Sequence, residues 1–514
     1  SEMSIQTECG LVVNLSSELK NYYDLFDSLK RLQHRGRESF GIGFVNPEKN
    51  TNYSINQFIN VEKYGLTVEE EKLSDKIKTE LSKVWFGHVR YSTSGLKTDK
   101  LYFTQPILFS LLNFDDLCLV FNGNIPLKEW QTIFNKYPML RKFYYNDKDN
   151  INDSYLIIQL LQILKNEEVS KIMKKKSQSS NQNSINLVTI DNILPKILIK
   201  FVNLIERAFS MVLISHQTTF IVRDRFGVRP LSLGEKTNEL IIASESCAFK
   251  EETKLICDFQ PGSVSIINND TRKINYFYSY QLDYKISGPK NTQYCLFEYL
   301  YFMRPKTTAN HINVKEFRID LGKLLIKEIK EFHPKNYEYL SKIKKQEQGN
   351  ILVCGIPSSG IVQAESFADN FGINYRQFIK QKKDYPHRTF ILENNTKRQD
   401  ACHKKYFITE DDKLDIENKI VILIDDSIVR GNTIKHLINF VKKHNPKEIH
   451  FLVSSPPIIN TCSYGVDFPS LEELVINRKT IEQFRIELNL KSLIYLKNNL
   501  VNKYNKNNFC LKCF

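Results

Sequence analysis

The chain has 514 residues, of which 41% are hydrophobic and 25% charged, and its formal net charge at pH 7 is +14. This length predicts two or more domains, each large enough to bury a hydrophobic core. No apolar run is long enough to span a membrane, and the first residues lack the basic and apolar regions of a secretory signal. The positive charge is spread over dispersed lysines without a zinc-finger or RNP pattern, so we expect neither nucleic acid nor a membrane as a partner.

The first half of the chain has the pattern of a strand-rich domain. A short buried strand is predicted at residues 9–15 and a helix at 17–33. Residues 154–165 have the length and period of a helix, whereas the polar, low-complexity stretch 167–186 predicts a disordered insertion. Further short apolar runs, typical of strands, lie at 41–45, 84–89, 117–123, 210–215 and 218–222.

The pattern changes near residue 290, and the boundary between the two architectures is expected within 270–295. Beyond it, near-continuous apolar strands alternate with helices, which is typical of a parallel, doubly wound sheet. The predicted elements are an amphipathic helix at 315–331, a strand at 351–357, a helix at 360–370, a strand at 419–427, a helix at 431–443 and a strand at 448–455.

Residues 421–433, VILIDDSIVRGNT, combine a buried strand with an acidic pair and a turn into a helix. The strand delivers Asp425 and Asp426 at its carboxyl end, where open α/β sheets bind ligands. Small and hydroxyl residues follow, and their backbone N–H groups can bind an anion at the start of the next helix. The acidic pair suits ribose hydroxyls or a divalent metal, so the string predicts a sugar held next to a phosphate. The alternative is an ordinary strand–turn–helix with an exposed acidic pair.

Ten cysteines are mostly scattered along the chain, without the regular framework of a small secreted domain, which predicts a reducing compartment. Two places are candidates for a functional role: Cys9 near the start, and the pair Cys510 and Cys513 in CLKC. A CxxC pair by itself is compatible with a redox pair, half of a zinc site or half of a cluster site.

The string at 421–433 closely resembles the phosphoribosylpyrophosphate loop of type I phosphoribosyltransferases. Its neighbours narrow the resemblance to the amidophosphoribosyltransferases of purine synthesis, and they are CLFEYLYFMRP (295–305), GIPSSG (355–360), HRTFI (387–391) and SSPPIINTCSYGVDFPSLEEL (454–474). In the first half the similar strings are LQHRGRESFGIGF (32–44), FGHVRYSTSG (86–95), FNGNI (121–125), RDRFGVRPL (223–231) and ASESCAF (243–249). The resemblance therefore covers nearly the whole chain.

This resemblance implies a fold that is α/β and α+β, with an N-terminal-nucleophile (αββα sandwich) glutaminase domain followed by a type I phosphoribosyltransferase domain with a parallel sheet. The implied boundaries are a propeptide at 1–8, the glutaminase domain at 9–275, the phosphoribosyltransferase domain at 290–490 and a C-terminal segment with cluster ligands at 491–514. The implied reaction is the first committed step of de novo purine synthesis. In it, glutamine, phosphoribosylpyrophosphate and water give 5-phosphoribosylamine, glutamate and pyrophosphate.

The resemblance makes Cys9 the nucleophile of the glutaminase half. Its thiolate would attack the glutamine side-chain amide while its own α-amine serves as the base. That amine is free only if residues 1–8 are removed, which the resemblance implies happens by self-cleavage after Glu8. Taken alone, a residue such as Cys9 is more often a buried cysteine of a strand than a nucleophile.

Four further residues of the glutaminase half match family positions. Asn122 and the Gly123 N–H would stabilise the tetrahedral oxyanion. Arg90 would bind the α-carboxylate of glutamine through its guanidinium fork, and Asp153 would hold the α-amine. Arg90 by itself is also compatible with a surface ion pair.

In the second half, the resemblance implies a Mg²⁺ ion on Asp425, Asp426 and Ser359, which would bridge the diphosphate and neutralise the leaving pyrophosphate. A loop around Tyr385 and Arg388 would close over the ribose site and form a tunnel for ammonia. The implied contacts with phosphoribosylpyrophosphate are those of Tyr385, Arg388, Asp425, Asp426, Ser427, Ile428, Val429, Arg430, Gly431, Asn432 and Thr433.

Iron–sulfur members of the family add one cysteine from each of two other motifs to the CxxC pair. The resemblance therefore implies a [4Fe–4S] cluster on Cys295, Cys462, Cys510 and Cys513. The alternative is four reduced, unligated thiols. The resemblance also implies a homodimer or homotetramer that purine nucleotides inhibit, in the cytosol or, as the alternative, in a plastid.

The chain departs from the family pattern at a few positions. Ser358 replaces an acidic residue, Tyr155 replaces another beside the glutamine site, and the flexible loop at 380–390 carries Asp384 near a position that is normally basic. Two alternatives follow. One is another Cys–Gly amidotransferase, such as an asparagine or glucosamine-phosphate synthase, against which the ribose-phosphate loop argues. The other is a degenerate relative that senses nucleotides or acts as a scaffold without turnover.

Overall fold

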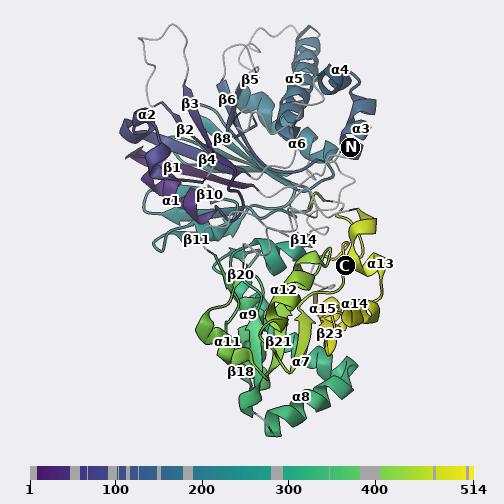
Figure 1. Ribbon diagram of the computed structural model, residues 1–514. Helices are drawn as coiled ribbons and strands as arrows, with labels where there is room; N and C mark the ends of the chain where they lie inside the picture. The colour runs from purple at the N-terminus through teal and green to yellow at the C-terminus, as the bar shows by residue number, and fades with distance from the viewer. Residues whose placement is uncertain are drawn as a thin grey trace. The chain divides into compact units, whose positions relative to one another are not determined.

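The computed structural model of the protein describes residues 9–46, 58–65, 67–90, 101, 103–111, 116–125, 127–146, 152–177, 189–278, 293–346, 348–382, 406–462, 464–466, 470–504 and 509–514. The chain divides into two compact units (Figure 1). The first comprises Ser1–Tyr294, Thr308–Asn310 and Ser463–Val466, and the second Cys295–Thr307, His311–Cys462 and Asp467–Phe514. Within the described ranges, no helix is long and apolar enough to cross a membrane.

The first unit contains two antiparallel sheets. The seven-stranded sheet has the order β11 (Lys254–Asp258), β9 (Ser232–Lys236), β10 (Glu239–Ala243), β1 (Gly10–Lys20), β4 (Ser82–Arg90), β2 (Ser39–Val45), β3 (Ile59–Gly65). The six-stranded sheet has the order β13 (Ile274–Tyr278), β12 (Ser263–Asn268), β8 (Thr218–Arg223), β7 (Phe209–Ile214), β6 (Asp116–Gly123), β5 (Ile107–Ser110). The helices are α1 (Tyr23–Arg31), α2 (Asp75–Thr79), α3 (Leu127–Lys136), α4 (Leu140–Asn146), α5 (Asp153–Ser177) and α6 (Ile190–Leu204).

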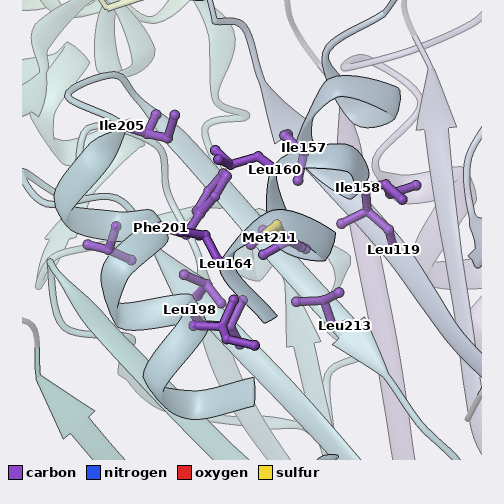
Figure 2. Close-up of a cluster of buried hydrophobic side chains, with 14 of the residues drawn as sticks. Leu119, Ile157, Ile158, Leu160, Leu164, Leu198, Phe201, Ile205, Met211 and Leu213 are labelled. Atoms are coloured by element: carbon purple, nitrogen blue, oxygen red, sulfur yellow. The ribbon is translucent and has the colours of Figure 1, made fainter. Parts of the chain in front are cut away.

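Three hydrophobic clusters separate four layers in this unit. Side chains of a strand alternate between its faces, so Val12 of β1 packs under α1 while Val13 faces the second sheet and meets Val212 of β7. Helices α5 and α6 cover the outer face of the six-stranded sheet, and Figure 2 shows Phe201 and Met211 in that cluster. The result is the expected αββα sandwich.

Two expectations for the first half were wrong in part. Strand β1 continues to Lys20, because Ser16 pairs with Glu239 and Lys20 with Ser82, so the helix begins only at Tyr23. Helix α5 continues to Ser177 through part of the predicted disordered insertion. It is held there by long-range contacts, including an ion pair of 2.9 Å between Glu168 and Lys200 of α6. The remainder of the predicted insertion, 178–186, lies outside the described residues.

The second unit is built on a parallel sheet with the order β18 (Asn374–Tyr375), β17 (Ile351–Gly355), β21 (Ile420–Asp425), β22 (Glu448–Val453), β23 (Ser492–Tyr495). In chain order this is 2-1-3-4-5, a doubly wound sheet whose order reverses between β17 and β21. The predicted helices and strands of this half are confirmed to within two residues at each end. The helices are α7 (Val314–Phe332), α8 (Pro334–Gln346), α9 (Ile361–Phe371), α11 (Glu410–Ile416), α12 (Asn432–Lys442), α13 (Val475–Arg478), α14 (Ile481–Glu487) and α15 (Asn498–Tyr504).

Candidate active site

Cys9 lies directly before β1 and is buried, with 7% of its surface exposed. Its backbone nitrogen donates to Oδ1 of Asn122, which is 3.4 Å away at the end of β6. Its carbonyl oxygen accepts from Nε of Arg35 at 3.0 Å. Both backbone groups of Cys9 are therefore held by hydrogen bonds, the nitrogen by Asn122 and the carbonyl oxygen by Arg35.

A buried ion pair supports Cys9, and neither partner was predicted from the sequence as a functional residue. Arg35 and Glu245 are both fully buried, and their side chains approach to 2.6 Å. His34 binds the same carboxylate oxygen at 2.7 Å. Arg35 and Glu245 lie inside two strings that resemble the family, but their pairing across 210 positions is not visible without the fold. Glu245, His34 and Cys247 also form a group close enough to share a metal ion, but Arg35 already neutralises the carboxylate.

Asn122 and Gly123 form the end of strand β6. Nδ2 of Asn122 is buried, and among the described residues it has no hydrogen-bond partner. Such a donor costs free energy unless a ligand binds it. A Cβ on Gly123 would lie 2.7 Å from Cβ of Phe209, so glycine alone fits at this position. Asn122 thus offers the Nδ2 amide donor to a ligand near the backbone nitrogen of Cys9.

Arg90 ends strand β4 and is buried, with 8% of its surface exposed. Its guanidinium carbon lies 5.5 Å from the centre of the Phe103 ring. Burial lowers the pKa of Arg90, and the negative charges of Cys9 and Glu38 oppose that shift. A buried guanidinium beside Cys9 is suited to a carboxylate ligand.

Asp153 is the first residue of α5. Its two oxygens accept hydrogen bonds from the Ile125 N–H at 2.8 Å and from the Trp130 indole at 2.9 Å. The residue keeps part of its surface exposed, but burial of the carboxyl group raises its pKa to about 6, against the opposing effect of the two hydrogen bonds. Because Ile125 follows Asn122 and Gly123 closely in the chain, Asp153 lies at the same end of β6.

The loops after β17 and β21 lie side by side in the second unit, since Gly355 pairs with Ile424. This is where the strand order reverses, the place at which such sheets bind ligands. The hydroxyl of Ser359 donates to Oδ1 of Asp426 at 2.5 Å, and that of Ser427 donates to Oδ2 at 2.5 Å. The predicted partners Ser359 and Asp426 are therefore in contact. Asp425 ends β21, and the N–H of Asp426 donates to its Oδ1 at 2.9 Å.

Helix α12 begins directly after this acidic loop. Gly431 caps it with a φ of +83°, in the left-handed region that favours glycine. A Cβ at this position would lie 2.8 Å from Cζ of Phe484. The first turn of α12, with Asn432 and Thr433, therefore presents backbone N–H groups and a hydroxyl at the carboxyl edge of the sheet.

The four cysteines of the expected cluster belong to the second unit. Burial raises the pKa of Cys513, and Cys462, Cys295 and Cys510 raise it further. Burial and Cys462 likewise raise the pKa of Cys510. Thiols that affect one another in this way are close neighbours, and a set of cysteine thiols is the donor set of an iron–sulfur cluster.

The segment that carries Cys510 and Cys513 is anchored to α7. Glu328 of α7 accepts hydrogen bonds from the backbone N–H groups of Asn498 and Asn499, at 3.0 and 2.9 Å, and so caps α15. The carbonyl oxygen of Cys513 accepts from the N–H of Ile459 at 2.9 Å. The C-terminal thiols are thereby fixed beside the loop that holds Cys462.

Several predicted positions lie outside the described residues: the propeptide 1–8, Tyr385, Asp384 and Arg388. Ser358 lies in the loop after β17, is exposed, and follows Pro357 through a cis peptide bond.

Comparison with known proteins supports both of the predicted domains. A phosphoribosyl transferase domain model matches residues 326–456, and a glutamine amidotransferase domain model matches residues 148–251. The amidophosphoribosyltransferase of Methanocaldococcus jannaschii is 30% identical, over 98% of this chain and 96% of its own. Amidophosphoribosyltransferase 1, chloroplastic, of Arabidopsis thaliana is 29% identical, over 99% of this chain and 78% of its own. The structure of the Bacillus subtilis glutamine phosphoribosylpyrophosphate amidotransferase complexed with ADP and GMP has a TM-score of 0.71 and 25% identity, and covers 98% of this chain and 96% of its own.

The fold and the two sites define a glutamine amidotransferase joined to a phosphoribosyltransferase. Given relatives that match along almost its whole length, the chain belongs to the amidophosphoribosyltransferase family. It is a glutamine-dependent pentosyltransferase of purine biosynthesis. It converts glutamine, phosphoribosylpyrophosphate and water to 5-phosphoribosylamine, glutamate and pyrophosphate.

Proposed function

We propose that Cys9 is the glutaminase nucleophile of this enzyme. The observation that carries the proposal is the 3.4 Å contact of the Cys9 nitrogen with Asn122, whose buried Nδ2 has no other partner among the described residues. The α-amine takes the thiol proton, and the thiolate attacks the side-chain amide carbon of glutamine. Asn122 and the Gly123 N–H bind the oxyanion. The protonated α-amine gives this proton to the amide nitrogen, which leaves as ammonia. Water then hydrolyses the thioester to glutamate.

The α-amine of Cys9 takes part only if residues 1–8 are removed. Sequencing the mature N-terminus, together with pyrophosphate release measured with glutamine and with ammonia, tests this step. We expect Cys9 as the first residue and activity with both nitrogen sources. An intact 1–8 segment with activity on ammonia alone would contradict the glutaminase assignment.

Glutamine itself is held at its two charged ends, by Arg90 at the α-carboxylate and Asp153 at the α-amine. This assignment rests on the buried guanidinium beside Cys9 and on the carboxylate at the same end of β6.

Glutamine binding should weaken in acid because Asp153 must be ionised to bind an ammonium group. Its pKa is raised to about 6, so the carboxylate is present above this value and lost below it. We expect the KM for glutamine to be flat above pH 6 and to rise about tenfold per pH unit below it. Steady-state kinetics between pH 5 and 8 measure this. In Asp153→Asn the KM should be high and independent of pH, and an unchanged pH profile in that variant would rule out the assignment.

The second unit binds phosphoribosylpyrophosphate in the loops after β17 and β21. Asp425 and Asp426 bind the ribose hydroxyls, and residues 427–433 bind the 5-phosphate at the start of α12. Mg²⁺ would be held by Ser359, Asp425 and Asp426, an all-oxygen set that suits a hard cation, and when bound it neutralises the diphosphate. Tyr385 and Arg388 complete the site from the loop outside the described residues. Ammonia attacks the ribose carbon, and pyrophosphate leaves.

Gly431 should be needed for both stability and substrate binding. In Gly431→Ala the positive φ and the 2.8 Å approach to Phe484 force the loop to shift. We expect a loss of about 1 to 2 kcal/mol in the free energy of unfolding, with a raised KM for phosphoribosylpyrophosphate. Denaturant titration and kinetics measure the two effects. Gly349→Ala is the matched control, since no atom lies within 4 Å of its Cβ position, and equal effects in the two variants would contradict the argument.

Cys295, Cys462, Cys510 and Cys513 hold a [4Fe–4S] cluster. This proposal is supported by the closeness of the other three cysteines to Cys513, since each of them raises the pKa of the Cys513 thiol. Iron and sulfide analysis of protein purified without oxygen tests it, with Cys513→Ser compared against Cys257→Ser of the first unit. Cys513→Ser should lose iron, whereas Cys257→Ser should keep it. A colourless, iron-free wild-type protein would exclude the cluster.

The ligands of a related structure support purine nucleotides as feedback inhibitors, and the family resemblance alone suggests a homodimer or homotetramer in the cytosol or in a plastid. The Bacillus subtilis enzyme is complexed with ADP and GMP. Inhibition assays with these nucleotides and light scattering of the purified chain test the two proposals.

A further inference from the structure

The strand that carries the oxyanion residues loses its edge partner just before it reaches the site. Strand β5 pairs with β6 from Ile107 opposite Leu119 to Ser110 opposite Asp116. Continuing this antiparallel register would place Gln105 opposite Phe121. Backbone pairing ends at Ile107, since Pro106 has no N–H to donate. Phe121 is the residue directly before Asn122.

The side chain of Gln105 takes over the role of the missing strand. Its Oε1 accepts from the Phe121 N–H at 2.5 Å, and its Nε2 donates to the Phe121 carbonyl oxygen at 3.1 Å. One amide thus satisfies both backbone groups of Phe121. His88 of β4 adds a contact from Nε2 to the same carbonyl oxygen at 3.1 Å. Burial lowers the pKa of His88 to about 3, so the ring is neutral and this nitrogen carries its proton.

Gln105 is itself fixed to the other sheet. A Cβ on Gly41 of β2 would lie 2.2 Å from the Gln105 carbonyl oxygen, so the two backbones are in direct contact. The neighbouring Thr104 donates to the hydroxyl of Ser39 at 2.7 Å. Much of the space between the sheets is filled by aliphatic and aromatic side chains. Polar bridges in such a core are costly unless they are fully paired, and these lie one residue from Asn122.

We propose that Gln105 is a positioning residue of the oxyanion site, which holds the end of β6 so that Asn122 and the Gly123 N–H face the reacting amide. This inference rests on the proposed roles of Asn122 and Gly123. A shift of about 1 Å in a preorganised donor is enough to cost up to about a hundredfold in rate. The side-chain hydrogen bonds of Gln105 reach Phe121 rather than the residues assigned to glutamine, so we expect Gln105 to act on the transition state rather than on binding.

The test is Gln105→Met, which keeps the side-chain length but removes both hydrogen bonds. We expect kcat with glutamine to fall about tenfold to a hundredfold, with less than about a threefold change in the KM for glutamine. Ammonia-dependent pyrophosphate release should be unchanged. Alkylation of Cys9 by iodoacetamide, followed by mass spectrometry, should keep its rate, because that reaction develops no oxyanion.

Asn269→Leu is the matched control. Asn269 is a buried amide of the same unit that also makes hydrogen bonds through both ends, to Thr219 and Ser215, at the far end of β12. It should lower the melting temperature to a similar degree but leave kcat unchanged. An equal loss of kcat in both variants, or wild-type kcat in Gln105→Met, would overturn the proposal. If Gln105→Met does not fold, Gln105→Glu decides by the same readouts, because it keeps the acceptor for the Phe121 N–H and replaces the donor to the Phe121 carbonyl oxygen by a carboxylate oxygen.

Asn122→Ala separates the two hypotheses. If that variant keeps its glutamine-dependent kcat, the oxyanion assignment itself fails. If Asn122→Ala loses activity while Gln105→Met does not, only the positioning role is rejected.

Discussion

Cys9→Ala is expected to lose glutamine-dependent pyrophosphate release by about 10³-fold or more, while release with ammonia persists. The proposed nucleophile and its α-amine act on glutamine alone, and the residues proposed for the phosphoribosyl site belong to the second unit. Pyrophosphate release with each nitrogen source, at saturating phosphoribosylpyrophosphate, measures the two activities on one sample. If the 1–8 segment is removed by self-cleavage, mass spectrometry should find it intact in this variant.

Cys118→Ala is the matched control for this experiment. Cys118 is also buried in the core of the first unit, and burial raises the pKa of its thiol, so it stays protonated and is no nucleophile. This variant should be less stable but should keep both activities. Full glutamine-dependent activity in Cys9→Ala would remove Cys9 from the mechanism.

Asp426→Asn should lose activity with both nitrogen sources, by about a hundredfold or more. The carboxylate accepts a hydroxyl from each of Ser359 and Ser427, and an amide can accept only one of them. The substitution also removes the charge that we propose orients the ribose and its cation. Kinetics with ammonia isolate this effect from the glutaminase.

Asp411→Asn serves as control, since Asp411 is an exposed carboxylate on α11. It should behave as wild type. Wild-type ammonia-dependent activity in Asp426→Asn would place the phosphoribosyl chemistry elsewhere.

The sequence predicted the second unit better than the first. Strands β17, β21 and β22 are apolar over nearly their whole length, so a short window of sequence is enough to identify them. The polar end of β1 and the lysine-rich end of α5 gave the wrong answer. Their structure depends on partners far along the chain, such as Glu239 for Ser16 and Lys200 for Glu168. Local propensity contains no information on such pairs.

The residues of the candidate site, too, were hard to predict where they depend on partners far along the chain. Ser359 and Asp426 could be predicted as partners only because a known family carries both motifs, and the structure places them in contact. Arg35, Glu245 and Gln105 escaped prediction although each lies in or near a quoted motif. A buried ion pair, or a side chain that replaces a strand, is recognisable only once the neighbouring strand is known.

The position of β1 between β10 and β4 has a consequence for the order of events during folding. Cys9 is placed by Arg35, 26 residues away, and by Asn122, 113 residues away, while β1 itself pairs with β10 across more than two hundred residues. These are contacts of high contact order, which form late. A chain that has not yet formed β10 therefore lacks the assembled site that we propose, and we expect it not to hydrolyse glutamine. The proposed glutaminase site is therefore complete only when both sheets of the sandwich have formed.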